Sequence, residues 1–375
     1  MTSVVAGRLD RLRGADFLDI AQLSAGQLTA LVELASDMKA GRWAGTPLSG
    51  RALALVFQKP SMRTRVSFQV GIQRLGGSVI TLTDQEIGLG SRESVEDVAR
   101  VLDRYVDGVV ARLSSHGDLL ALADASNKPV INALTDGSHP CQILADLLTI
   151  RESVGRLDDT SPVAFVGDGN NVARSLIEAA AVLRFPLTVI TPPAYAPPIG
   201  VAEAAPTVRA TSDLRALEGA AVVYTDVWTS MGHEAEAEAR RERFAEYQVN
   251  EELMALAPQA VFMHCLPAHR GEEVTAGVID GRRSVVFDQA ENRLWAQMAL
   301  LASIFGQGGA SGPGSPGRSP LGGIPPSERG GASGPGSPGR SPLGGTPPSE
   351  QGGANGPGSP GRSPGGGTPP SEQGG

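Results

Sequence analysis

The stretch ALALVFQKPSMRTRVSF, residues 52–68, decides how this chain folds, because it joins a buried strand to a helix through a cationic turn. Its first six residues are apolar, which is typical of a strand buried on both faces. From Val66 to Leu75 apolar residues recur at helical spacing. The polar cluster between Lys59 and Arg65 therefore lies where a strand turns into a helix.

That junction is suited to binding an anion. Free N–H groups and the positive end of the helix dipole point outward at a helix N-terminus. Arg63 and Arg65 would add fixed charge with forked donors that match phosphate. A solvated basic turn without a ligand is the alternative that this stretch alone leaves open.

The same alternation of strand and helix continues through most of the chain. The strand-like segments are, in order, ALALVF, SVITLT, GVVARL, PVINAL, PVAFVG, LTVITP, AVVYTDV, AVFMHCL and SVVFDQ. Between most of them lie amphipathic stretches, such as SVEDVARVLDRY, GDLLALADAS, QILADLLTIRESV and ARSLIEAAAVLRF. This pattern predicts an α/β protein with two doubly wound parallel-sheet domains and a cleft between them.

The expected domain boundaries follow from the position of the helices. The first domain would span residues 1–137 and be completed by a C-terminal helix at about 290–306. The second would span 138–289, and a helix from Cys141 to about Val154 would bridge the two halves.

Residues 310–375 are three copies of a 22-residue unit, the first of which reads ASGPGSPGRSPLGGIPPSERGG. These 66 residues contain 22 glycines, 15 prolines and no aromatic residue. Because they bury too little apolar surface to offset the entropy of ordering, we expect a disordered tail. Its role stays open between a partner-binding arm, a spacer and a by-product of repeat expansion.

The charge and cysteine content exclude several classes of partner. The whole chain carries a net charge of −8, and the tail has four arginines and three glutamates, so the remainder carries −9. An acidic body argues against nucleic acid or an anionic membrane as the main partner. Two cysteines, the lack of a secretory segment and the lack of an apolar run of about 18 residues predict a cytoplasmic protein without a membrane span.

Unusual polar residues fall repeatedly just after the predicted strands. In parallel sheets the carboxyl ends of the strands gather at one edge, where ligands bind. The positions concerned are Arg63, Arg112 and the segments DGSHPCQ, GDGNN, DVWTSMG and HCLPAHRGEE. Six such positions at one topological level predict a single cleft that is lined from both domains.

Several other kinds of site fit less well. GDGNNVARS lacks the full glycine pattern of a dinucleotide site, so its asparagines Asn170 and Asn171 would instead offer amide hydrogen bonds to a small polar ligand. His264 and the two cysteines lack the spacing of a zinc site, and we expect no metal. The residues alone leave Cys265 open between nucleophile, substrate contact and apolar filler, and His139 between helix cap and carbonyl-polarising group.

The motifs SMRTR, HPCQ, DVWTSMG, HCLPAHR and FDQAENRL resemble, in order and spacing, those of ornithine carbamoyltransferases in the aspartate/ornithine carbamoyltransferase superfamily. The resemblance covers about residues 15 to 306. It implies transfer of the carbamoyl group of carbamoyl phosphate to the δ-amine of L-ornithine, without cofactor or metal. The product L-citrulline serves arginine biosynthesis or degradation. The segment DQEIGLGSRES matches a region that family members lend to a neighbouring subunit, which implies a homotrimer.

The resemblance also implies a role for each matching residue. Those expected to bind carbamoyl phosphate, in the first domain and around the bridging helix, are Ser61, Met62, Arg63, Thr64, Arg112, His139, Gln142, Leu266 and Arg293. Those expected to bind ornithine, in the second domain, are Asn171, Asp226, Ser230, Met231 and Cys265. The catalytic residues among them would be Arg112, His139, Cys265 and Arg293.

Three features depart from the family pattern. Met62 stands where threonine is usual, Gln289 replaces the commoner glutamate, and the segment after Thr191 looks too short for the usual helix. Two alternative functions remain: a carbamoyltransferase for a related amine such as putrescine, lysine or N-acetylornithine, and a non-catalytic binding protein. The second would be expected to lose Arg63, Arg112 or His139, and all three are present.

Overall fold

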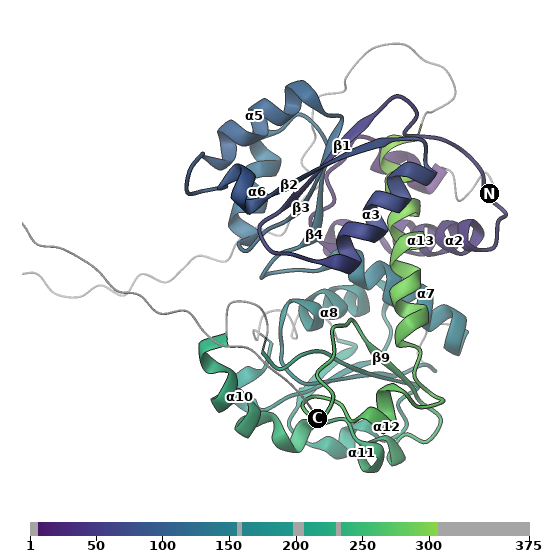
Figure 1. The fold of residues 1–375 in the computed structure, drawn as a ribbon. Coiled ribbons are helices and arrows are strands. Elements are labelled where there is room, and N and C mark those ends of the chain that lie inside the picture. The colour runs from purple at the N-terminus through teal and green to yellow at the C-terminus, as the bar shows by residue number, and fades with distance from the viewer. Residues whose placement is uncertain (1–6, 156–159, 198–205, 230–233, 307–375) are drawn as a thin grey trace, which may run out of the picture. The chain divides into compact units, whose positions relative to one another are not determined.

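The computed structural model describes residues 7–155, 160–197, 206–229 and 234–306, and in them the chain forms two parallel sheets (Figure 1). The first sheet has the strand order β2-β1-β3-β4, and the second has the order β7-β6-β5-β8-β9. The strands are β1 Ala52–Phe57, β2 Ser78–Thr83, β3 Gly108–Arg112, β4 Val130–Leu134, β5 Val163–Val166, β6 Leu187–Ile190, β7 Val208–Thr211, β8 Val222–Thr225 and β9 Val261–His264. The predicted α/β fold with two parallel-sheet domains is confirmed.

The helices lie between the strands, as the sequence pattern indicates. They are α2 Ala25–Lys39, α3 Met62–Arg74, α4 Asp84–Ile87, α5 Val95–Tyr105, α6 His116–Ala125, α7 Pro140–Val154, α8 Asn171–Leu183, α10 Ala237–Phe244, α11 Glu251–Ala255, α12 Ala276–Ile279 and α13 Val286–Phe305. The four amphipathic stretches quoted above correspond to α5, α6, α7 and α8. Serine side chains cap the first two of these, Ser94 for α5 and Ser115 for α6, by accepting a backbone N–H of the first turn.

Eight of the nine predicted strands are present, and the prediction for SVVFDQ is wrong. That segment pairs with β9 only at its start, where Val285 N–H donates to Phe262 C=O at 3.0 Å. It then forms the first turn of α13. A short apolar run does not distinguish a strand from a buried helix end. Strand β7 was not predicted, because its residues are only half-buried or exposed at the sheet edge and give no apolar run.

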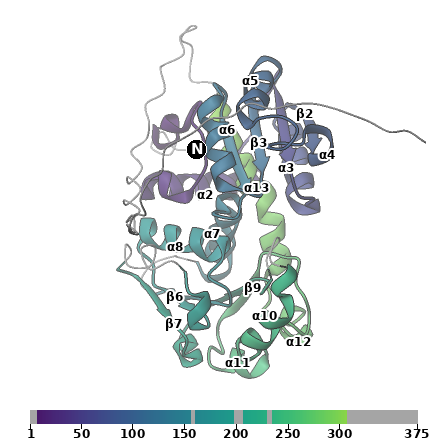
Figure 2. The ribbon, with the colours of Figure 1, turned by 90° about the vertical axis from the view of Figure 1, so that its left-hand side faces the viewer.

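Helix α13 connects the two sheets. It packs against α2, α3 and α7 and also contacts β9, and Figures 1 and 2 show it running beside α7. Most of α7 is buried, from Pro140 to Ile150, because helices cover it on several sides. The C-terminal helix begins at Val286, earlier than the predicted start at about 290. The domain boundary between residues 137 and 138 stays a prediction.

Each sheet has one point at which the strand order reverses. In the first sheet the order reverses between β1 and β3, and in the second between β5 and β8. Ligands of doubly wound folds bind at such points, outside the carboxyl ends of the strands. Arg112 is the last residue of β3, Arg63 and Asn171 lie in the first turns of the helices that follow β1 and β5, and Asp226 directly follows β8. The topology therefore places these predicted residues at the two reversal points.

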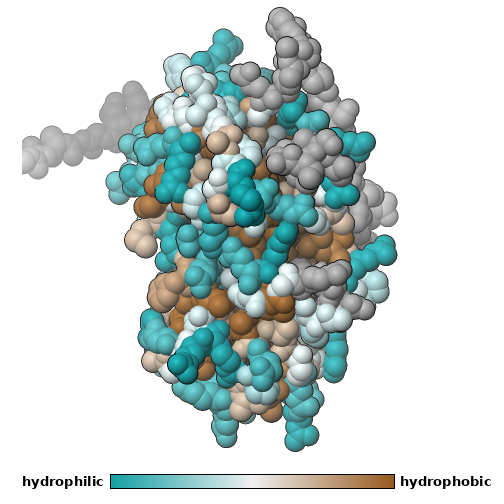
Figure 3. Space-filling view, turned by 90° about the vertical axis from the view of Figure 1, so that its right-hand side faces the viewer, coloured by the Kyte–Doolittle hydropathy of each residue, from teal (hydrophilic) through white to brown (hydrophobic). Residues whose placement is uncertain are grey.

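Several predicted features lie partly or wholly outside the described residues. These are the repeat tail 310–375 and, within the segment predicted to lack a helix, residues 198–205. The flanking parts of that segment form a short 3-10 helix, Pro193–Tyr195, and strand β7. On the face shown in Figure 3, patches of hydrophobic side chains lie among hydrophilic ones. Among the described helices, none has the length and apolar character needed to cross a bilayer.

Candidate active site

A cleft with a volume of about 650 Å³ lies between the carboxyl ends of the two sheets. It is lined by twelve of the fourteen residues predicted for the site: Ser61, Met62, Arg63, Thr64, Arg112, His139, Gln142, Asn171, Asp226, Cys265, Leu266 and Arg293. The other two, Ser230 and Met231, lie outside the described residues. The structure therefore brings together residues that are up to 232 positions apart in the sequence, from Ser61 before α3 to Arg293 on α13.

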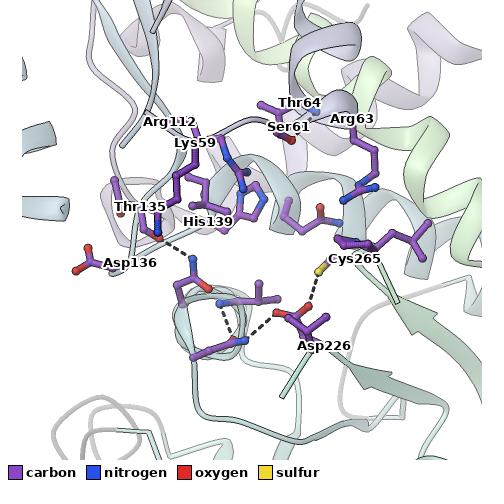
Figure 4. Close-up of a pocket in the computed structure, with 18 of the residues that line it drawn as sticks. Lys59, Ser61, Arg63, Thr64, Arg112, Thr135, Asp136, His139, Asp226 and Cys265 are labelled. Atoms are coloured by element: carbon purple, nitrogen blue, oxygen red, sulfur yellow. Dashed lines mark hydrogen bonds between the residues drawn. The ribbon is translucent and has the colours of Figure 1, made fainter. Parts of the chain in front are cut away.

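The cationic turn of the opening stretch forms the start of α3. Ser61 caps this helix, since its Oγ accepts the Thr64 N–H at 3.4 Å. Met62 is the first helical residue, is 72% exposed and is one of the residues that line the cleft. Arg63 points into the cleft (Figure 4), whereas Arg65 is exposed outside it. The expectation that both arginines serve the anion site is therefore wrong for Arg65.

Three arginines from three elements converge on one end of the cleft, which we call the cationic end: Arg63 of α3, Arg112 at the end of β3 and Arg293 of α13. Burial, followed by the charges of Arg293 and Arg63, lowers the pKa of Arg112 to about 10. Burial likewise lowers the pKa of Arg293. All three remain charged at neutral pH, so like charges are held together where an anion would stabilise them.

Arg293 is held in place by polar side chains of the cleft. Its Nη2 donates to Thr64 Oγ1 at 2.8 Å, and its Nη1 donates to Gln142 Oε1. The same Nη1 lies 3.4 Å from His139 Nε2. These contacts join α13 to α3 and α7 directly at the cleft, which explains how a C-terminal helix contributes to a site built on the first sheet.

His139 is a neutral imidazole with a defined tautomer. Burial, followed by the charges of Arg293, Arg112 and Arg63, holds its pKa well below the ordinary value. Because an arginine can only donate, the Arg293 contact makes Nε2 the acceptor and leaves the proton on Nδ1. This buried Nδ1 has no hydrogen-bond partner among the described residues. It is therefore a buried donor that the described residues leave unsatisfied.

The side of the cleft that belongs to the second sheet, which we call the acidic end, consists of Asp226 and the groups bound to it, and Arg63 is close enough to interact electrostatically with Asp226 and Cys265. Asp226 follows β8, and its two oxygens accept the Cys265 Sγ–H at 2.8 Å and the Asn170 Nδ2–H at 2.8 Å (Figure 4). Burial and the neighbouring Asp226 carboxylate raise the pKa of the Cys265 thiol well above its ordinary value. Cys265 is consequently a protonated hydrogen-bond donor and not a thiolate, which argues against the nucleophile considered above.

The GDGNN turn after β5 positions two asparagines. Asn170 caps α8 by accepting the N–H groups of Val172 and Ala173, and its amide donates to Asp226. Asn171 donates to the Thr135 C=O at 2.6 Å. A Cβ at Gly169 would come within 2.5 Å of the Pro197 nitrogen, so only glycine allows the turn to pack this closely.

The loop after β9 is held by a buried histidine and glutamate. Leu266 has a positive φ of 57° and precedes a cis peptide bond to Pro267. Its N–H donates to His264 Nδ1 at 2.9 Å, so the proton of this imidazole is on Nε2, which donates to Glu273 Oε1 at 3.1 Å. Glu273 also accepts the His269 N–H at 2.6 Å, and thus fixes both ends of the loop that carries Cys265.

Within the part of the chain that the structure describes, two trios of side chains have donor atoms close enough to suggest a metal site. In the first, Asp226, His264 and Cys265, the carboxylate and thiol bind each other and both imidazole nitrogens are occupied. In the second, His269, Glu272 and Glu273, Glu273 binds the loop after β9 and Glu272 pairs with Arg241 at 3.1 Å. In the first trio each of these groups already has a partner, whereas Glu273 Oε2 of the second trio is buried without a hydrogen-bond partner among the described residues. The expectation of no metal stays a prediction.

Sequence reasoning missed four charged residues that line the cleft: Lys59, Asp136, Asp168 and Arg240. Arg240 of α10 donates to Asp168 Oδ2 at 2.8 Å and to the Trp228 C=O at 2.9 Å, and thereby ties the loop after β8 to the loop after β5. Lys59 and Asp168 belong to segments already singled out and could have been found there. Arg240 gives no sequence signal, because its helix is rich in charges without a motif.

Two models of known protein domains match this chain. The model of the aspartate/ornithine carbamoyltransferase carbamoyl-P binding domain matches residues 15–152. The model of the aspartate/ornithine carbamoyltransferase Asp/Orn binding domain matches residues 159–304. The chain belongs to the aspartate/ornithine carbamoyltransferase family. The two models divide the chain between the two sheets.

Within this family the similar proteins carry the name ornithine carbamoyltransferase. One from Symbiobacterium thermophilum is 49% identical over 307 residues, which cover 78% of this chain and 99% of that protein. One from Deinococcus radiodurans is 49% identical over 301 residues, with 79% and 98% covered. The structure of the Pyrococcus furiosus enzyme superimposes with a TM-score of 0.75 at 46% identity, covering 79% of this chain and 98% of that one. The family predicted from the motifs is confirmed.

Proposed function

We propose that this chain transfers the carbamoyl group of carbamoyl phosphate to the δ-amine of L-ornithine, giving L-citrulline and phosphate. The observation that carries the proposal is the charge of the cleft, where three arginines line the side of the first sheet and Asp226 lines the side of the second. A phosphate dianion and an amino acid with two ammonium groups require this arrangement. The similar proteins named ornithine carbamoyltransferase support the same conclusion.

The phosphate of carbamoyl phosphate would bind at the cationic end. Ser61, Met62 and Thr64 offer hydroxyl groups and backbone N–H groups at the start of α3, which is 13 residues long. Arg63 and Arg112 offer charge-assisted hydrogen bonds. The departure at Met62 matters little in this arrangement, since the exposed side chain leaves the backbone N–H available.

The carbamoyl group would lie between His139, Gln142, Arg293 and the backbone of Leu266. The neutral δ-amine attacks the carbamoyl carbon, and a tetrahedral intermediate forms. The bond from carbon to the phosphate oxygen then breaks, phosphate leaves with the electron pair, and the attacking nitrogen loses a proton. Placement and fixed charge would together lower the barrier by on the order of ten kcal/mol. His139 Nδ1–H is suited to the developing oxyanion, because it is a donor without a partner in the described structure.

Ornithine would bind at the acidic end. Asp226 would accept the α-ammonium group, and Asn171 would donate to the α-carboxylate. Ser230 and Met231 are assigned to the same groups on the motif alone. Cys265 would lie beside the reacting δ-amine as a protonated thiol.

A steady-state assay of citrulline formation tests the proposal. Purified protein is given carbamoyl phosphate with L-ornithine, putrescine, L-lysine or N-acetylornithine, and kcat/KM is compared between acceptors. We expect ornithine to exceed the others by at least about a hundredfold, because a site that binds both α-substituents leaves buried polar groups unpaired with analogues that lack them. Equal or higher kcat/KM with putrescine or N-acetylornithine would replace ornithine as the substrate.

A homotrimer is a further part of the proposal. The edge strand β2 is largely uncovered, and three apolar side chains nearby are unusually exposed: Met62 at 72%, Val66 at 51% and Ile80 at 46%. A second copy of the chain would cover this surface, next to the segment 84–94. Light scattering of the purified protein measures the mass directly. Arginine metabolism and a cytoplasmic location are proposed with it, on the sequence features given above.

A further inference from the structure

One buried carboxylate lies behind the cleft and receives hydrogen bonds from three elements. Asp146 of α7 is fully buried. Its Oδ1 accepts Gln142 Nε2–H at 2.8 Å and Gln289 Nε2–H at 2.7 Å, and its Oδ2 accepts the Tyr224 hydroxyl at 2.9 Å. Gln142 is on the same helix, Gln289 is on α13, and Tyr224 is on β8 two residues before Asp226.

This carboxylate sets the direction of two amide groups. A glutamine amide has a donor end and an acceptor end, and a carboxylate accepts only from the donor end. Because Asp146 holds the Nε2 groups, the Oε1 of Gln142 points at Arg293 Nη1 and the Oε1 of Gln289 accepts the His264 N–H at 2.9 Å. Without this acceptor, either glutamine amide could rotate and bring its Nε2–H group against the donor that its Oε1 now accepts, which is Arg293 Nη1–H for Gln142 and His264 N–H for Gln289.

The second amide extends the network to the loop after β9. Gln289 receives the N–H of His264, and His264 in turn receives the N–H of Leu266 at 2.9 Å. One carboxylate is therefore connected both to the Gln142–Arg293 pair at the cationic end and to the loop that carries Cys265 and Leu266. Asp146 itself is not one of the residues that line the cleft.

We propose that Asp146 is a positioning residue for the carbamoyl group, acting through the orientation of Gln142 and, through Gln289, of the loop after β9. The inference rests on the proposed function and deepens it, because it assigns carbamoyl phosphate binding to a group that does not touch the substrate. It also explains Gln289, which stands where the family usually has glutamate. In this chain the amide lets one ionised carboxylate serve both glutamines without a shared proton.

The charge state of the network gives a test. The titratable or charged groups that face Asp146 are Arg293 from α13, Tyr224 from β8 and Cys265 after β9. Burial raises the pKa of Asp146 to about 6, so it is ionised at pH 8.5. In Gln289→Glu a second carboxyl faces Oδ1, and the pair must share one proton. The shared proton raises the pKa of the pair. The hydrogen bonds that orient Gln142 and the loop after β9 therefore persist at low pH and are lost as the pH rises.

The experiment measures the affinity for carbamoyl phosphate by calorimetry at pH 6 and pH 8.5, with kcat and KM at both values. For Gln289→Glu we expect affinity within about threefold of wild type at pH 6 and at least about tenfold weaker at pH 8.5, since one unit of pKa is a factor of ten. Gln289→Met removes both hydrogen bonds without adding charge and should weaken binding equally at both pH values. The melting temperature of each variant is recorded in parallel.

Gln297→Glu is the matched control. Gln297 is fully buried on the same helix, and its amide atoms have no hydrogen-bond partner among the described residues. This variant adds a buried carboxylate away from Asp146 and should not produce pH-dependent loss of carbamoyl phosphate affinity. If Gln289→Glu follows wild type at both pH values, or loses only melting temperature, the inference is overturned. Wild type that binds carbamoyl phosphate without forming citrulline would instead overturn the proposed function.

Discussion

At the cationic end of the cleft, Arg63 makes no hydrogen bond or ion pair with the described residues, whereas at the acidic end Asp226 already accepts hydrogen bonds from Cys265 and Asn170. The first end holds like charges together before any ligand is present. The second end satisfies its carboxylate internally. The two halves of one site therefore differ in what a ligand must do: an anion fills the first, but an ammonium group must share or displace existing contacts at the second.

This difference has a physical origin in how each end is built. The cationic groups come from the end of a strand, the first turn of α3 and the middle of α13, which are anchored by packing. The acidic groups come from loops whose positions depend on one another through hydrogen bonds. Mutations at the cationic end should consequently affect ligand binding with little effect on the fold, while mutations at the acidic end should affect both.

The largest effect is expected for Arg63→Leu. This change removes charge-assisted hydrogen bonds to the phosphate, on the scale of losing an oxyanion donor, and should lower kcat by about 10³-fold or more. The melting temperature should change little, because Arg63 has no hydrogen-bond partner among the described residues that the change would remove. Steady-state kinetics and thermal unfolding measure the two quantities.

Arg65→Leu is the matched control for that variant. Arg65 lies one half-turn further along α3 and is exposed outside the cleft. It should keep kcat and KM within about twofold of wild type, since surface substitutions away from partners have small effects. Equal losses in both variants would mean that the whole basic turn acts by its net charge, and full activity in Arg63→Leu would contradict the assignment of the cationic end.

The sequence predicted the cationic end better than the acidic end. Arg63 and Arg112 follow buried strands, and the carboxyl ends of parallel strands must meet, so their convergence follows from the pattern alone. The state of Cys265 could not be predicted, because it depends on a hydrogen bond to Asp226, 39 residues away. The role of Arg240 and the network around Asp146 were equally invisible, because both depend on contacts between elements distant in sequence.

The errors in the fold have local causes. The prediction of a strand for SVVFDQ rests on its short apolar run, but tertiary packing makes this segment the start of α13. Arg65 was assigned to the anion site because composition does not show which side of a helix a residue occupies at its first turn. In both cases the sequence pattern shows the character of the residues, but tertiary packing decides the secondary structure of the first segment and the side of the helix that Arg65 occupies.

An intermediate effect is expected for Asp226→Asn. The change removes a charged acceptor for the α-ammonium group, which contributes roughly 1.5–3 kcal/mol, so kcat/KM for ornithine should fall by about 10²-fold. Affinity for carbamoyl phosphate should stay within about threefold of wild type, because the cationic end does not depend on Asp226 for a hydrogen bond. Calorimetry with carbamoyl phosphate alone separates the two ends, and a comparable loss of its affinity would show that they are one coupled unit.

The smallest effect is expected for Cys265→Ser, and its pH profile is more informative than its rate. An ornithine δ-ammonium should titrate near the lysine reference of about 10.4, so kcat/KM for ornithine should rise with pH between about 6 and 8.5 as the neutral amine becomes more abundant. Burial and Asp226 raise the pKa of the Cys265 thiol above that range, so the thiol does not titrate there. A serine hydroxyl can still donate to Asp226, and the variant should therefore lose no more than about tenfold in rate while keeping the rising limb. Loss of that rising limb in Cys265→Ser would identify the thiol as the titrating group. A flat pH profile in the wild type would show that proton removal is not limiting. Complete inactivity of Cys265→Ser, together with a carbamoyl group trapped on the wild-type thiol, would establish a covalent route in place of direct attack.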